Sequence, residues 1–119
     1  MELTRSEREI MDVFWESEDP LSRAELLKKS VNKSWKDSSV HILLNGMLQK
    51  GVIREAGVVK CSKTYGRTFL PTLTREEYYA ELPYSYRAKP DIVGLMEALW
   101  NRKDISDEQR EQIRKIIIE

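Results

Sequence analysis

Apolar residues recur at helical spacing in the segment from residue 37 to residue 51. They stand at positions i, i+3, i+4, i+7 and i+8, and they are Val40, Leu43, Leu44, Met47 and Leu48. This spacing predicts a helix that buries one stripe of its surface. Asp37 is placed to cap the start of this helix, and Gly51 is placed to end it in a left-handed conformation.

The opposite face of this predicted helix carries a different kind of side chain. Its members are short hydrogen-bonding groups and one isoleucine, namely Ser38, His41, Ile42, Asn45 and Gln49. An ordinary solvent-facing surface would carry Glu and Lys instead, since a few such pairs keep a helix soluble. We therefore interpret this face as a surface that recognises a partner.

Two helices are predicted before this segment. Thr4 and Glu7 have the spacing of a capping box and open the first helix, which is rich in apolar residues. Ser22 and Glu25 repeat that spacing and open the second helix, which is expected to reach about Val31 and to bury it. With the third helix they match the helix-turn-helix arrangement.

The hydrophobic period changes after the third helix. Residues 52–57 and 64–73 are expected to form two strands of a hairpin, joined by a long tip over residues 58–63 that carries Lys60 and Lys63. A basic hairpin in this position is the wing of a winged helix, and its cations are placed to reach phosphates beside a groove of DNA. An ordinary solubilising hairpin is the alternative interpretation.

Residues 74–119 predict further helices with wide apolar stripes. Pro83 and Pro90 bracket a kink or linker between them. Two short helices cannot cover each other fully, which favours dimerisation over packing back on the same chain. The expected dimerisation residues are Tyr78, Tyr79, Leu82, Ile92, Leu95, Met96, Leu99, Trp100, Ile113, Ile116 and Ile117.

The formal charge of the chain is zero, but its charges are unevenly placed. The first 20 residues carry a net charge of −5, residues 21–73 carry +7, and residues 74–119 carry −2. A basic middle between acidic ends is a plausible electrostatic footprint for a phosphate backbone. A basic surface that is merely solvated is the alternative.

Composition narrows the chemistry further. One cysteine, Cys61, and one histidine leave no disulfide framework and no zinc cluster, so no metal or cofactor is expected. No nucleophilic triad spacing or glycine-rich phosphate loop is present, which favours a binding protein over an enzyme. The absence of a long apolar run and of a signal-peptide pattern predicts a cytoplasmic protein without membrane insertion.

Four segments together resemble the penicillinase repressor family, of the BlaI/MecI/CopY type. They are LTRSEREIMDVFWE at the start, LSRAELLKK, residues 35–51, and YGRTFLPTLTREEY across the hairpin. The resemblance implies a homodimeric winged helix-turn-helix repressor whose third helix enters the major groove of a palindromic operator. It also implies release by an inducing signal, which in relatives is cleavage by a membrane-bound penicillin-sensing protease or, in the copper-responsive branch, metal binding.

The expected architecture is mostly α with a small antiparallel β-hairpin. Residues 1–73 are the predicted winged helix DNA-binding domain, and residues 74–119 are the predicted helical dimerisation region. The expected DNA contacts are Trp35, Lys36, Ser38, Ser39, His41, Ile42, Asn45, Gln49, Arg54, Lys60, Lys63 and Arg67. The expected partners are a double-stranded DNA operator, a second copy of the chain and a sensor protease.

Two other functions fit the same sequence. A winged-helix protein-interaction module would use the face of the third helix for a protein partner and would bind no DNA. An anti-activator or assembly subunit would act through the C-terminal helices alone. Binding to duplex DNA that falls steeply with salt separates the first expectation from both.

Overall fold

The computed structural model describes residues 2–61 and 63–118, which form helices and a small antiparallel sheet. The elements are α1 (Arg5–Glu16), β1 (Leu21–Ser22), α2 (Arg23–Lys29), η1 (Asp37–Ser39), α3 (Val40–Lys50), β2 (Ile53–Cys61), β3 (Thr64–Pro71), α4 (Arg75–Glu81), η2 (Leu82–Ser85), α5 (Ile92–Trp100) and α6 (Asp107–Ile118). They make two compact units, Met1–Ser85 and Tyr86–Glu119, and each is described by itself. The predicted fold class is confirmed.

Local hydrogen bonds explain where the first two helices begin. The Thr4 hydroxyl accepts from the backbone N–H of Glu7 (3.2 Å), and the Glu7 carboxylate accepts from the backbone N–H of Thr4 (2.9 Å). Ser22 and Glu25 form the same reciprocal pair, at 3.2 and 3.0 Å. Each pair satisfies backbone N–H groups that a helix start leaves unpaired. Both predicted capping boxes are therefore confirmed.

The second helix ends earlier than predicted. It stops at Lys29, where the hydroxyl and backbone N–H of Ser30 both donate to the carbonyl of Leu26. Asn32 then takes a left-handed conformation with φ 54°, which turns the chain away from the helix direction. Val31 is left 77% exposed, so the expectation that it is buried was wrong.

The third helix has the predicted stripe and the predicted end, but a different start. Its apolar stripe packs into the core, and Gly51 ends it with φ 75°. Asp37 does not cap it, because Asp37–Ser39 form a turn of 3-10 helix before α3 begins at Val40. The Asp37 carboxylate instead pairs with Lys33 at 2.6 Å.

The core of the first unit lies between the helices and the base of the sheet. Its buried members are Leu3, Ile10, Met11, Phe14, Leu21, Leu26, Trp35, Val40, Leu44, Met47, Val52, Ile53, Phe69 and Tyr78. Each of the four α-helices of this unit, α1 to α4, contributes at least one of them, so the apolar faces of these helices share one interior. The outward face of α3 is thereby fixed by the burial of its other face.

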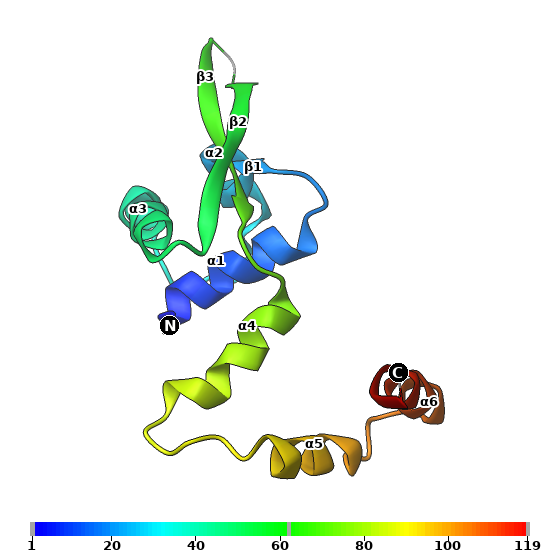
Figure 1. Ribbon diagram of the computed structural model, residues 1–119. Coiled ribbons are helices and arrows are strands. Elements are labelled where there is room, and N and C mark those ends of the chain that lie inside the picture. The colour runs from blue at the N-terminus through cyan, green and yellow to red at the C-terminus, as the bar shows by residue number, and fades with distance from the viewer. Residues whose placement is uncertain (1, 62, 119) are drawn as a thin grey trace. The chain divides into compact units, whose positions relative to one another are not determined.

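The sheet has the strand order β1-β3-β2, with both neighbouring pairs antiparallel. The sequence pattern did not predict β1, which pairs Leu21 with Phe69. The hairpin of β2 and β3 extends well beyond the helices (Figure 1). The prediction of a long tip over residues 58–63 was wrong, because residues 58–61 continue the β2–β3 ladder up to the pair Cys61 and Thr64. The side chain of Cys61 lies outside the described part of the structure.

The fourth helix packs against α1. Trp15 and Tyr78 have ring centroids 5.8 Å apart, and the Trp15 Nε1–H donates to the carbonyl of Leu73 at 3.0 Å. Arg75 lies over the Trp15 ring and pairs with Glu16 at 3.0 Å. The hydrogen bond that Arg75 donates to the Glu16 carboxylate raises the pKa of Arg75 above its ordinary value. Helix α4 thus belongs to the first compact unit by its contacts.

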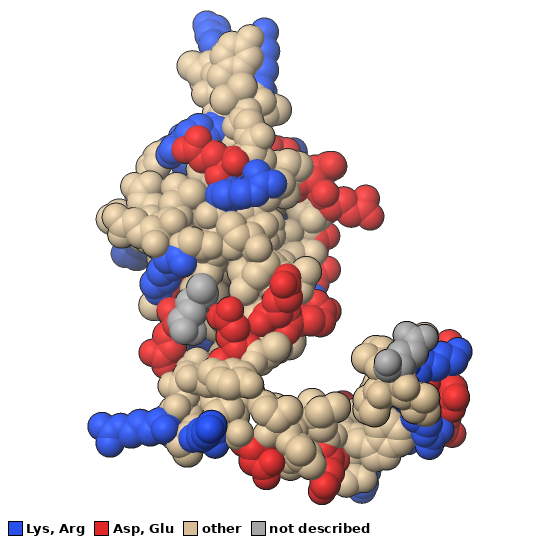
Figure 2. All heavy atoms as spheres, in the orientation of Figure 1, with Lys and Arg blue, Asp and Glu red and all other residues tan. Residues whose placement is uncertain are grey.

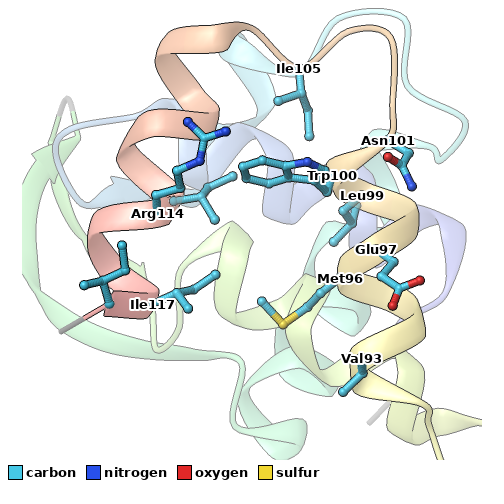
Figure 3. Close-up of a pocket in the computed structure, with 11 residues that line it drawn as sticks. Val93, Met96, Glu97, Leu99, Trp100, Asn101, Ile105, Arg114 and Ile117 are labelled. Carbon is cyan, nitrogen blue, oxygen red and sulfur yellow. The ribbon is translucent and has the colours of Figure 1, made fainter.

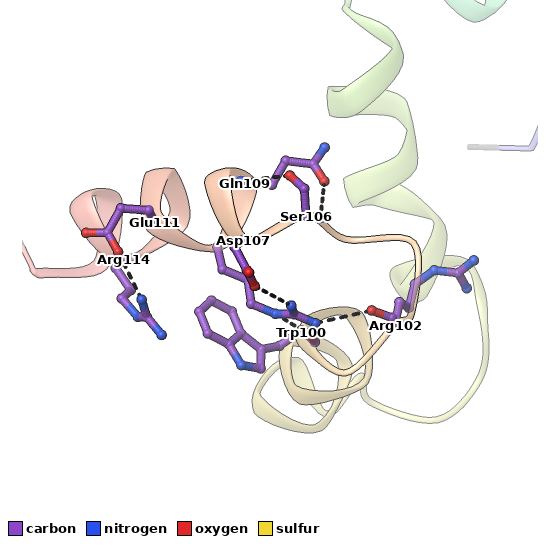
Figure 4. A network of polar contacts seen from close by, with 8 residues as sticks. Trp100, Arg102, Ser106, Asp107, Gln109, Glu111 and Arg114 are labelled. Carbon is purple, nitrogen blue, oxygen red and sulfur yellow. Dashed lines mark hydrogen bonds and ion pairs between the residues drawn. The ribbon is translucent and has the colours of Figure 1, made fainter.

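The second unit consists of α5 and α6 folded about one tryptophan. The Trp100 ring lies between the two helices, with Arg114 directed toward it (Figure 3). Arg110 donates to the carbonyl of Trp100 from Nη2 (2.9 Å) and Nε (3.2 Å), so it satisfies a carbonyl at the end of α5 (Figure 4). A capping box of Ser106 and Gln109 opens α6. Arginine contacts therefore hold this pair of helices together.

Candidate nucleic-acid interface

The outward face of α3 is exposed along its length. Ile42 is 77% exposed, and His41, Asn45 and Gln49 are exposed as well. Helix α3 contains no Asp or Glu, so no carboxylate on this helix repels a phosphate. The face combines hydrogen-bonding groups with one apolar group, which is the chemistry needed to contact base edges in the major groove.

The residues before α3 divide into surface and core. Lys36 and Ser38 are exposed, and Ser39 is half-buried. Trp35 is only 7% exposed and belongs to the core, with the Lys33 ammonium 5.1 Å from its ring centroid. Because its ring is packed inside, we leave Trp35 out of the proposed DNA contacts.

The hairpin presents cations of two kinds. Lys60 and Lys63 are exposed and form no ion pair within the described residues, whereas Arg67 pairs with Glu55 on the neighbouring strand at 2.5 Å. Figure 2 shows basic side chains at the far end of the hairpin. Arg54 is exposed near its base and donates to the carbonyl of Glu55. Unlike Arg67, the two lysines and Arg54 form no ion pair within the described residues that a bound anion would have to break.

A groove of about 280 Å³ lies between helix α3 and the hairpin of β2 and β3. Its lining comes from the start of α2, from α3 and from β3, and it includes Arg23, His41, Asn45, Tyr65 and Arg67. The Arg23 guanidinium contacts the His41 ring. Sequence reasoning did not single out Arg23 or Tyr65. The only signal for Arg23 was its place in the basic middle segment, because its proximity to α3 depends on the packing.

An ion pair holds the end of α3 against α1. The Lys50 ammonium lies 2.6 Å from the Glu7 carboxylate, whose side chain is only 7% exposed. Burial opposes ionisation of Glu7, but hydrogen bonds from Lys50 and Thr4 outweigh it and keep the pKa of Glu7 below its ordinary value. The charged pair therefore fixes the direction in which α3 presents its outward face.

A second contact attaches the loop before α3 to helix α1. The backbone N–H and the hydroxyl of Ser34 donate to the two carboxylate oxygens of Glu9, at 2.8 and 2.7 Å. These two hydrogen bonds, the backbone one foremost, lower the pKa of Glu9. The loop and the helix that follows it are thus both tied to α1.

The predicted dimerisation residues occupy two different environments. Tyr78 is buried in the first unit and Leu82 packs against its core, whereas Tyr79 is 54% exposed. The remaining predicted residues lie in the second unit, where Trp100 and Ile113 are half-buried. The others there are exposed, namely Ile92, Leu95, Met96, Leu99, Ile116 and Ile117.

No group of three or more His, Cys, Asp or Glu side chains in the described ranges is arranged to hold a metal ion. No helix found in residues 2–61 or 63–118 has both the length and the apolar character needed to cross a bilayer.

This domain has three packed helices, an exposed uncharged face on the third helix, and a basic hairpin. These features define the class of protein, which is the winged helix-turn-helix domain of DNA-binding transcription regulators. The chain belongs to the penicillinase repressor family, because the profile of that family, described as "Penicillinase repressor", matches residues 3–119. This family is a family of transcriptional repressors and is not a class of enzymes. Comparison with curated proteins gave no match.

Proposed function

We propose that this repressor binds a palindromic operator as a homodimer, with α3 in the major groove and the wing on the phosphate backbone. The observation that carries the proposal is the exposed, carboxylate-free face of α3 beside a hairpin with unpaired lysines. An α-helix fits the width of the major groove, and exposed cations beside it neutralise phosphates. Two-fold operator symmetry then mirrors the symmetry of the dimer.

Individual contacts follow from the chemistry of the α3 face. Asn45 is suited to a bidentate contact with adenine, since its amide both donates and accepts. Ile42 offers an apolar surface for the methyl group of thymine, and His41 is suited to a base or phosphate contact. Lys60 and Lys63 carry no sequence information in this scheme, because they meet phosphates.

The dimer contact is assigned to α5 and α6. Neither helix has a buried residue, although α5 is almost entirely apolar. Isolated helices shorter than about 12 residues are marginal in water, so a nine-residue apolar helix needs a partner surface. An apolar groove of about 690 Å³ crosses both helices and includes Met96, Leu99 and Ile117 (Figure 3). A second copy brings an equal surface to cover it.

Release from the operator requires an inducing signal. Resemblance to the penicillinase repressors suggests cleavage of the chain by a membrane-bound sensor protease. Dimerisation makes such a step effective, because the second half-site binding event is intramolecular only while the two copies stay joined. Cleavage that separates the helices of the second unit from the winged helix removes that advantage.

A binding titration over a series of salt concentrations tests the proposal. Purified protein is mixed with sheared genomic DNA, and the retained fragments are sequenced. The expected result is enrichment of one palindromic sequence, with affinity that falls steeply as salt rises. Retention without enrichment would contradict specific reading by α3. Absence of binding even near ~50 mM salt would reject DNA binding and favour the protein-interaction module.

A further inference from the structure

Arg23 is a cation that contacts the outward face of α3 through His41. It lines the groove between α2, α3 and β3, and it forms no ion pair with an Asp or Glu of the described chain. Glu25, two residues away, has its carboxylate engaged by the backbone N–H of Ser22 at 3.0 Å. The groove therefore keeps an uncompensated positive charge beside α3.

The second arginine of the groove is in a different state. Arg67 stands over the Phe69 ring at 5.4 Å and pairs with Glu55. An arginine bound to a carboxylate must give up that pair before it binds a phosphate, whereas Arg23 has no ion pair to give up among the described residues and can bind a phosphate while it still contacts His41. Of the two arginines, Arg23 is the better placed to bind an anion.

We propose that Arg23 binds one phosphate of the operator backbone in this groove and positions the His41 ring for reading the adjacent base pair. The assignment rests on the proposed DNA binding and adds a contact to it. A guanidinium matches the geometry of a phosphate and can donate from two nitrogens at once. A strand that passes between α3 and the wing brings a phosphate to the groove while α3 meets the bases.

The contact with His41 gives Arg23 its second role. The Arg23 guanidinium meets the His41 ring and so restrains the orientation of that ring on the outward face of α3. Loss of Arg23 leaves the exposed His41 ring without this restraint, so the base preference set by His41 weakens as well.

Fluorescence-anisotropy titrations of the full chain test both roles, with the enriched operator and with a random duplex, over a series of salt concentrations. For Arg23→Ala we expect about tenfold weaker binding to the random duplex, a larger loss on the operator because base preference is lost as well, and a salt slope smaller by about 0.9, the change for one lost phosphate contact. Arg23→Lys should restore the slope because it keeps the charge. Lys28→Ala is the matched control, an exposed cation of the same helix that does not line the groove.

Measuring base preference separates the positioning of His41 by Arg23 from the effect of the positive charge of Arg23. Arg23→Lys should keep the salt slope but lose base preference at the same operator base pair where His41→Ala loses it. The double variant Arg23→Lys with His41→Ala should then bind the operator only slightly more weakly than Arg23→Lys alone. An unchanged salt slope in Arg23→Ala, or a slope lost equally in Lys28→Ala, would overturn the phosphate assignment. If the unaltered chain binds the operator and Arg23→Lys keeps its full preference, the positioning role is wrong. Failure of the unaltered chain to bind any duplex refutes the proposed function instead, and this assignment with it.

Discussion

Substitution of Lys50 by Ala tests how α3 is held in place. Lys50 donates to the Glu7 carboxylate at 2.6 Å and to the carbonyl of Glu2 at 3.0 Å. Breaking a fully buried pair costs about 3–5 kcal/mol because a charge is left unpaired. The Lys50 side chain is 36% exposed, so water reaches the carboxylate after truncation and reduces the cost. We expect a loss of about 1–2 kcal/mol in the free energy of unfolding.

The pH dependence of this loss follows from the lowered pKa of Glu7. Burial raises that pKa, but Lys50 and Thr4 together hold it below the ordinary 4.5. A carboxyl whose pKa is lower in the folded chain stabilises the fold above its unfolded pKa, and this stabilisation disappears as the pH falls through the folded pKa. The difference between the unaltered chain and Lys50→Ala should therefore be full near pH 7 and shrink below about pH 4.5.

Urea unfolding followed by tryptophan fluorescence measures this difference, at one fixed protein concentration so that dimerisation does not change. Lys36→Ala serves as the control, because Lys36 is exposed and precedes the same helix. Glu7→Gln keeps a side chain that can complete the capping box, so the double variant with Lys50→Ala should show a coupling of about 1 kcal/mol. Equal destabilisation at pH 3.5 and at pH 7 would show that Lys50 acts through packing and would refute the charge argument.

Four further results are expected. Asn45→Ala should cost roughly 1–3 kcal/mol at one base pair of the operator and little on random DNA, whereas equal loss on both would remove its reading role. Lys60→Ala should weaken binding to every sequence alike and lower the salt slope by about 1, as measured by titration. Leu99→Glu, at a half-exposed position of α5, should shift the chain to monomers in sedimentation experiments while the circular dichroism of the first unit persists. Trp15→Phe should lose about 1 kcal/mol, because the bond to the Leu73 carbonyl is lost, and an unchanged urea midpoint would count against that bond.

Much of the secondary structure could be predicted because its signals are local. The capping boxes at Thr4 and Ser22 each join residues three apart, and their hydrogen bonds form as expected. The stripe of α3 and the left-handed Gly51 depend only on helical spacing and on backbone freedom. Such signals reach no farther than one or two turns of chain.

Two errors arose where one local contact replaced the expected one, and a third arose where pairing with another strand decides the structure. Val31 lies beyond the helix because Ser30 closes α2 on Leu26. The hairpin tip is short because residues 58–61 pair with β3, and the pattern of a single strand does not reveal the length of its ladder. Asp37 pairs with Lys33 rather than with the backbone of α3.

By itself the sequence determined which segments are helices, which face of α3 is apolar, and that the cations gather in residues 21–73. The tertiary structure decided which side chains reach the interface. It buried Trp35, paired Arg67 with Glu55, and brought Arg23 to His41 across 18 positions of chain. The physical reason is that periodicity and capping act between near neighbours, whereas these contacts exist only after the helices and sheet have packed around one core.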